Sequence, residues 1–179
     1  LEISREAETM EMEAWQDMMA AMPSGVAGAL QPDCRMVGGA LAISARALPL
    51  ATFNRAMGLG LEGPADAGAV GALAEHLRQA AAPVVQVQVA PFARPADLDR
   101  LLGKAGLRRA PVAWAKMGRR TAAPPTPSTE LAVEEATPDT AGDFAGAVVQ
   151  GFGMPPFFTD WLRALVGRER WRCYVARQG

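Results

Sequence analysis

A proline-rich stretch between residues 119 and 130 most limits how this chain can fold. It reads RRTAAPPTPSTE, with three prolines and no large apolar side chain. Proline fixes φ and lacks a backbone N–H, so neither a helix nor a central strand is expected here. We therefore predict a linker over 119–130, a domain over 1–118 and the beginning of a second domain over 131–179.

Composition and charge narrow the class of protein. Half of the residues are hydrophobic and the net charge is −1, which indicates a buried core and no strong field. Binding to nucleic acid by phosphate neutralisation is therefore not expected. The sequence has no apolar run of membrane-spanning length and no secretory signal, so we expect a cytoplasmic protein without membrane contact. Abundant Ala, Gly and Pro are typical of a GC-rich, bacterial-like genome.

Cysteine and histidine are scarce. Cys34 and Cys173 are far apart, and neither has neighbours with a metal-ligand spacing. We expect two reduced thiols and no metal site. The single histidine, His76, is expected on a helix near the border of its apolar face, where a structural role is the ordinary interpretation.

Hydrophobic periodicity predicts alternating helices and strands in the first domain. Asp66 is expected to cap a helix, and the valines of VVQVQVA alternate with Gln86 and Gln88. This order predicts a mixed α/β layer. The predicted helices cover 6–22, 66–81 and 95–105, and the predicted strands cover 36–46, 51–61, 84–90 and 107–118.

The pattern restarts after the linker. A strand is predicted from 131 to 136 and another from 171 to 179, with two short helices between them. Their apolar faces require a cover. The sequence leaves three sources open: a longer parent of which this chain is a truncation, a strand from 131 that completes the first sheet, or a homodimer. We favour the truncated parent.

The second segment resembles the first third of a GNAT domain (acyl-CoA N-acyltransferase fold). The first segment is similar to the later part of a second, degenerate GNAT domain. There ADLDRLLGKAGLRR (96–109) places Lys104, Gly106 and Leu107 where the family has Lys, Gly and an aromatic. The matching positions of the second segment are Leu131, Phe144, Phe152, Trp161, Leu165, Trp171, Tyr174, Val175 and Ala176.

This resemblance implies a GNAT-like mixed sheet with helices on both faces, the second unit incomplete, in a tandem-domain parent. That parent would transfer acetyl from acetyl-CoA to a small-molecule or peptide amine. The family holds the coenzyme diphosphate with an Arg/Gln-x-x-Gly-x-Gly/Ala loop at a helix N-terminus. Here the corresponding turn reads LEGPADAG (61–68), and the carboxylates of Glu62 and Asp66 would repel a diphosphate. We expect no cofactor and no catalytic residue in this chain, which alone would be inactive. The alternative is a non-catalytic binding or scaffolding module.

Four residues are candidates for an acceptor pocket. Asn54 lies in a predicted strand, and Phe152, Phe157 and Trp161 lie in the helices that border the acceptor groove in proteins of the resembled family. Each also has an ordinary interpretation. A polar strand residue commonly faces solvent, and aromatic side chains at helical spacing commonly pack in a core.

Overall fold

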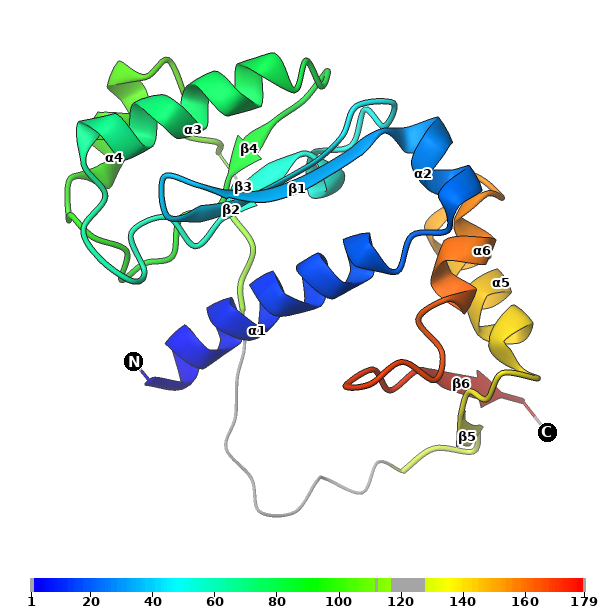
Figure 1. Ribbon diagram of the computed structural model, residues 1–179. Coiled ribbons are helices and arrows are strands. Elements are labelled where there is room, and N and C mark those ends of the chain that lie inside the picture. The colour runs from blue at the N-terminus through cyan, green and yellow to red at the C-terminus, as the bar shows by residue number, and fades with distance from the viewer. Residues whose placement is uncertain (1, 112, 117–127, 179) are drawn as a thin grey trace. The chain divides into compact units, whose positions relative to one another are not determined.

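The computed structural model describes residues 2–111, 113–116 and 128–178, which group into two compact units (Figure 1). Unit 1 comprises Leu1–Asp17 and Leu30–Arg120, and unit 2 comprises Met18–Ala29 and Thr121–Gly179. The predicted fold class is confirmed, because the chain combines helices with a sheet of mixed strand directions. The predicted domains assigned all of 1–118 to one body, whereas residues 18–29 group here with the C-terminal segment.

Unit 1 is built on a four-stranded sheet in the order β1-β2-β3-β4. Strand β2 pairs antiparallel with both β1 and β3, and β4 pairs parallel with β3 after the intervening helix α3. The elements are α1 (Glu2–Ala20, of which the part up to Asp17 belongs to unit 1), β1 (Pro32–Val37), β2 (Ala40–Ala45), the 3-10 turn η1 (Ala51–Phe53), β3 (Arg55–Met57), α3 (Ala67–Gln79), β4 (Gln86–Val87) and α4 (Leu98–Lys104).

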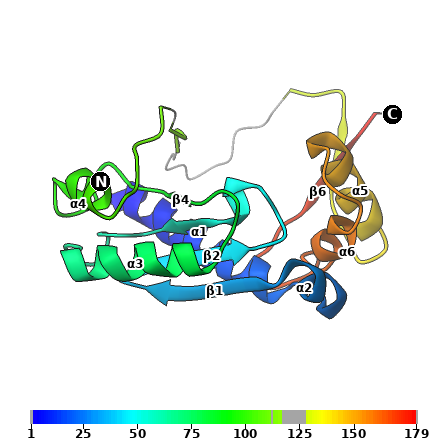
Figure 2. The same cartoon turned by 90° about the horizontal axis from the view of Figure 1, so that it is seen from above.

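The two faces of this sheet carry different side chains. Successive residues of a strand point to opposite faces. Ala40, Ala42 and Ala56 share a buried cluster with the apolar stripe of α3, including Leu73 and Leu77. Figures 1 and 2 show α3 on one face and α1 on the other. The small alanines therefore let α3 approach the backbone of the sheet closely.

Strand register determines which side chains lie next to one another on the opposite face of the sheet. Leu41 lies beside Met57, and Ile43 lies beside Arg55 on the neighbouring strand. All four side chains are buried. The sheet thus presents a guanidinium within an otherwise apolar surface toward α1. This single basic position organises the candidate site described below.

Helix α3 follows the sequence prediction closely. The Asp66 side chain accepts a hydrogen bond from the Ala69 N–H at 2.7 Å, which confirms the expected N-cap. Helix α4 begins later than predicted, at Leu98, but buries Leu98 and Leu102 as its apolar spacing requires.

Several strand predictions were wrong in extent. The predicted strand over 36–46 is interrupted, because Gly38 and Gly39 have φ of 58° and 81° and form the turn between β1 and β2. Two consecutive positive φ values suit a tight hairpin whose twist matches that of the strands. The strands over 51–61 and 84–90 shrink to β3 and β4. Residues 107–111 and 113–116 form no strand, and the remainder of the strand expected at 107–118 lies outside the described residues.

Unit 2 contains the four elements predicted after the linker and a helix from the N-terminal part of the chain. Strands β5 and β6 pair antiparallel in a sheet of their own, so the alternative in which the strand from 131 completes the first sheet is wrong. The linker itself lies largely outside the described residues. The elements are α2 (Ser24–Leu30, of which the part up to Ala29 belongs to unit 2), β5 (Ala132–Glu135), α5 (Ala141–Phe152), α6 (Phe158–Arg163) and β6 (Tyr174–Arg177).

The core of unit 2 shows where part of its cover comes from. Leu165, Cys173 and Val175 are buried, and Met18 and Ala21 pack against them. The Trp161 indole N–H also donates to the Met18 carbonyl at 2.7 Å. Residues that precede the first sheet in the sequence therefore cover apolar surface of the C-terminal segment. The sequence pattern alone did not indicate this source.

The β1–β2 turn allows a paired test of backbone geometry against packing. Both glycines have positive φ, but a Cβ on Gly38 would lie well inside van der Waals contact with the Ala69 carbonyl, whereas a Cβ on Gly39 would meet nothing. We predict that Gly39→Ala costs about 1–2 kcal/mol through backbone strain alone. Gly38→Ala should cost about 1–3 kcal/mol more, because hairpin and helix must separate. Urea unfolding of the two variants measures this difference, and equal losses would contradict the close approach.

Candidate functional site

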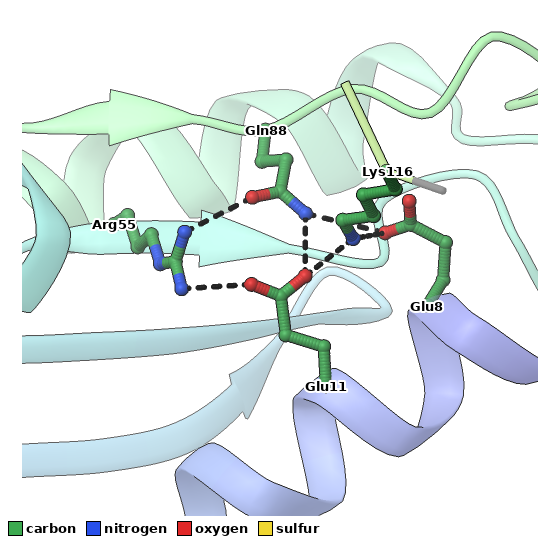
Figure 3. A network of polar contacts seen from close by, with 5 residues as sticks. All are labelled: Glu8, Glu11, Arg55, Gln88 and Lys116. Carbon is green, nitrogen blue, oxygen red and sulfur yellow. Dashed lines mark hydrogen bonds and ion pairs between the residues drawn. The ribbon is translucent and has the colours of Figure 1, made fainter. Parts of the chain in front are cut away.

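A charged network lies between α1 and the sheet of unit 1 (Figure 3). It joins residues far apart in the sequence: Glu8 and Glu11 on α1, Arg55 on β3, Gln88 just beyond β4, and Lys116 in the irregular segment 113–116. Glu8 and Glu11 are three residues apart, so they project from one side of the helix on successive turns. The network is the candidate functional site of this unit.

Arg55 is the centre of the network and is held on three sides. Its side chain is 8% exposed, and Nη2 donates to Glu11 Oε1 at 2.9 Å. Nη1 donates to Gln88 Oε1 at 3.1 Å. The guanidinium also lies over the Trp15 ring, 4.8 Å from its centroid, and Trp15 in turn forms a T-shaped pair with Phe53. A cation over an aromatic face gains from the ring quadrupole, which adds to the ion pair.

One donor of this guanidinium remains unused. Arg55 Nε is buried and has no hydrogen-bond partner among the described residues. An unmade hydrogen bond inside a protein costs about 1–3 kcal/mol. Since Nε makes no hydrogen bond, Arg55 is held in place by its ion pair with Glu11, its contact with the Gln88 amide and the Trp15 ring.

Gln88 links the two halves of the network. While its Oε1 accepts from Arg55, its Nε2 donates to Glu8 Oε2 at 3.2 Å and to Glu11 Oε2 at 3.1 Å. This donor pattern fixes the orientation of the amide. Gln88 thereby holds the two carboxylates with one oxygen of each directed to a common point.

Lys116 occupies that point. Its Nζ lies 2.7 Å from Glu8 Oε2 and forms a second ion pair with Glu11 Oε2. The Glu8 side chain is only 7% exposed, so its charge is largely removed from water. Two carboxylates and two cations make the group neutral, which is the condition under which buried charges are tolerated.

The pKa of Glu11 reflects the opposing effects of burial and of its polar contacts. Burial raises it, but the hydrogen bonds from Lys116 and Gln88 and the charges of Arg55 and Lys116 outweigh burial and place the pKa below its ordinary value of 4.5. The carboxylate form is therefore favoured in the folded protein.

Sequence reasoning did not predict this network. Glu8 and Glu11 lie in the helix predicted over 6–22, and Arg55 lies in the strand predicted over 51–61, but no pattern joined them. The spacing of Glu8, Glu11 and Trp15 could have shown that both carboxylates share a face with a large aromatic side chain. No local signal points to Gln88 or Lys116, because only the fold brings them to α1.

The bend at 61–68 forms a second, shallower feature at the N-terminus of α3. A hollow of about 210 Å³ is lined by both glycines of the β1–β2 turn, by Gly60 and by residues 62–66 and Ala69. The Asp66 carboxylate is hydrogen-bonded to the first turn of the helix, and exposed Glu62 lines the same hollow. Arg94 donates to the Glu62 carbonyl rather than to a side chain. Carboxylate charge therefore occupies the end of α3 that would otherwise attract an anion.

The predicted acceptor residues are placed as follows. Asn54 is fully buried; its Nδ2 donates to the Leu48 and Leu50 carbonyls, and its Oδ1 accepts from the Ala45 N–H. Its amide thus binds the backbone of unit 1 instead of facing an opening. In unit 2, Trp161 is 2% exposed and Phe152 is 77% exposed.

Phe157 lies between these extremes, 38% exposed and stacked on Phe158, which stacks in turn on Trp161. Stacking of this kind is typical of core aromatics at helical spacing. An acceptor pocket built from these residues stays a prediction.

The other residues considered for chemistry, His76 and the two cysteines, lie in surroundings typical of structural residues. His76 lies 3.5 Å from the Asp33 carboxylate at the end of α3, and both cysteines are free thiols, as expected. Burial raises the pKa of Cys34 and of Cys173, which disfavours the reactive thiolates. Within 2–111, 113–116 and 128–178 no three potential metal ligands gather, and no helix is long and apolar enough to span a bilayer.

Comparison with known proteins adds no identification. No family model matches this chain, and no match was found among curated proteins or solved structures.

The lowered pKa of Glu11 predicts a specific pH dependence. A carboxyl whose folded pKa is depressed contributes stability above its unfolded pKa, and this is lost as pH falls through the folded value. At pH 7 we expect Glu11→Gln to cost about 2–3 kcal/mol, because Arg55 loses its charged partner. The gap between the two proteins should narrow below pH 4.5.

Urea unfolding between pH 3 and pH 7 measures that gap. Glu62→Gln is the matched control, since Glu62 is exposed, and should change stability by less than about 0.5 kcal/mol. A Glu11→Gln loss that stays constant over the whole range would contradict an ion pair at this position.

Proposed function

We propose that this chain belongs to an acetyl-CoA-dependent N-acyltransferase with a GNAT-like fold, in which unit 1 is a non-catalytic layer. The coenzyme binds outside unit 1, and the acceptor is a small-molecule or peptide amine. Alone, residues 1–179 do not transfer acetyl groups. A homodimer remains one prediction for how such a protein assembles.

The strand and helix order of unit 1 supports this assignment. An antiparallel run β1-β2-β3 is followed by α3, by β4 parallel to β3, and by α4. Up to α4 this is the order expected from the resemblance noted in the sequence, whereas the last expected strand (107–118) does not form over the described residues 107–111 and 113–116. Unit 2 supports it further, because a strand, two helices and a second strand follow each other there.

The contact between Asp66 and Ala69 carries the claim that unit 1 does not hold the coenzyme. The carboxylate Oδ1 accepts from the Ala69 N–H at 2.7 Å, so an N–H that could bind phosphate is already used. A diphosphate placed there would lie against the charges of Asp66 and Glu62 in a hollow that the β1–β2 turn partly closes. Both effects disfavour the coenzyme.

A binding module without any acyl transfer is the second candidate. The observation that favours it is the network of Figure 3, in which two acidic side chains already hold an ammonium group. Such a unit could recognise a cationic partner through the same residues without performing chemistry on it.

Acetyl-CoA binding separates the two candidates. A ligand that binds only the folded state raises the melting temperature in proportion to ln(1 + [L]/Kd). We expect no shift for residues 1–179. For the protein expressed from its complete natural reading frame we expect a rise of about 5–10 °C at one hundred times Kd.

Two other outcomes would each contradict one part of the proposal. If neither protein shifts, the acyltransferase proposal fails and the binding module stands. If residues 1–179 shift, and Asp66→Asn with Glu62→Gln strengthens that shift, unit 1 holds the coenzyme and the non-catalytic assignment fails. Desulfo-CoA, which keeps the diphosphate, controls for binding through the thioester alone.

A further inference from the structure

We propose that Glu8, Glu11 and Gln88 form a binding site for an unbranched primary alkylammonium group, and that Lys116 occupies this site from within the chain. The ligand class is the terminal ammonium of a lysine side chain or of a linear alkylamine. The proposal is independent of acyl transfer, since it concerns binding only.

The first support is the ammonium that already lies there. Lys116 lies more than one hundred residues after Glu8 and Glu11 in the sequence, yet its Nζ forms ion pairs with Glu8 Oε2 and Glu11 Oε2. An ammonium has three donors and no acceptor, so two carboxylate oxygens directed to one point match its chemistry. The occupied site therefore displays the group that it selects.

The second support is that the receiving oxygens are oriented by residues other than Lys116. Arg55 holds Glu11 Oε1 at 2.9 Å, and Gln88 Nε2 donates to one oxygen of each carboxylate. Arg55 is itself fixed, being 8% exposed and packed over Trp15. The site is thus arranged before the ammonium enters, which lowers the entropic cost of binding.

Charge balance supplies the driving force. With Lys116 in place the network is neutral; without it, two carboxylates face Arg55 alone. Glu8, at 7% exposure, would then have no cation against it among the residues of Figure 3. A buried carboxylate without a partner is strongly unfavourable, so the emptied site favours either a proton or an external cation.

The basic residues of this chain indicate an ammonium in preference to a guanidinium. The sequence contains sixteen arginines and only two lysines, Lys104 and Lys116. One of these two lies between the carboxylates, and its ammonium is a compact point charge, unlike the planar fork of a guanidinium. The Lys116 side chain is 31% exposed, so solvent reaches this residue in the site.

Chemical rescue tests the proposal in the complete 1–179 chain. Lys116→Ala should lower the melting temperature, and n-butylammonium chloride should raise it again, saturably, by about 3–6 °C at ten times Kd. Wild-type protein should show a much smaller rise at the same concentration, because the ligand must first displace Lys116. The variant Lys104→Ala is the matched control, since Lys104 lies on exposed surface of α4.

Three comparisons decide the result. n-Butanol, which has the same chain without the charge, should not rescue Lys116→Ala, and Glu8→Gln in that background should abolish rescue. N-acetyl-lysine amide and 1,4-diaminobutane distinguish a peptide-borne ammonium from a free diamine. A folded Lys116→Ala variant that shows no saturable rise, or one that n-butanol stabilises equally, would overturn the proposal.

A second measurement keeps the test valid if Lys116→Ala does not fold. In wild-type protein labelled with 15N-lysine, only two side-chain ammonium signals exist. The Lys116 signal should be protected from proton exchange relative to that of Lys104, and excess n-butylammonium should progressively remove this protection. A Lys116 signal that exchanges like Lys104, or that n-butylammonium leaves unchanged, refutes the site.

Discussion

The ion pair between Arg55 and Glu11 is the interaction on which the arrangement of unit 1 depends. The strand register places a guanidinium in a face otherwise made of Leu41, Ile43 and Met57, and a buried cation requires a counter-charge. Helix α1 supplies it, with Trp15 one turn further along against the same cation. Apolar packing alone would let α1 slide or rotate on this face, whereas a directional ion pair fixes both the position and the rotation of the helix.

From that contact the rest of the network follows in sequence. Gln88, next to β4, accepts a hydrogen bond from Arg55 Nη1 and turns its amide N–H groups toward Glu8 and Glu11. The carboxylates then create a point of high negative potential that Lys116 neutralises. Each member is held by the previous one, so α1, β3, the residue after β4 and the segment 113–116 are joined through five side chains (Figure 3). The same contacts stabilise unit 1 and form the site proposed above for an ammonium group.

At the N-terminus of α3, a carboxylate interacts with a helix N–H group and not with a cation. At the bend of 61–68 the Asp66 carboxylate binds the start of α3, and Gly38 lets the β1–β2 turn approach the Ala69 carbonyl. A helix N-terminus is a ready anion site only while its N–H groups are free. Here one of these groups, the Ala69 N–H, donates to the Asp66 side chain and so stabilises the helix itself. In unit 1, the sheet face toward α1 thus carries a buried cation, Arg55. The N-terminal end of α3 already carries negative charge.

The sequence by itself determined the elements that depend on local chemistry. The Asp66 cap, the apolar stripe of α3 and the alternation around Gln86 and Gln88 follow from short-range spacing, and the mixed α/β class follows from their order. Only the tertiary structure decided which distant residues meet. Glu8 and Glu11 lie in a helix predicted from apolar spacing alone, Asn54 was a candidate for an acceptor pocket, and residues 18–29 were assigned to the first domain. Their actual surroundings depend on contacts between residues tens of positions apart, which periodicity cannot encode because it records only the face on which a side chain lies.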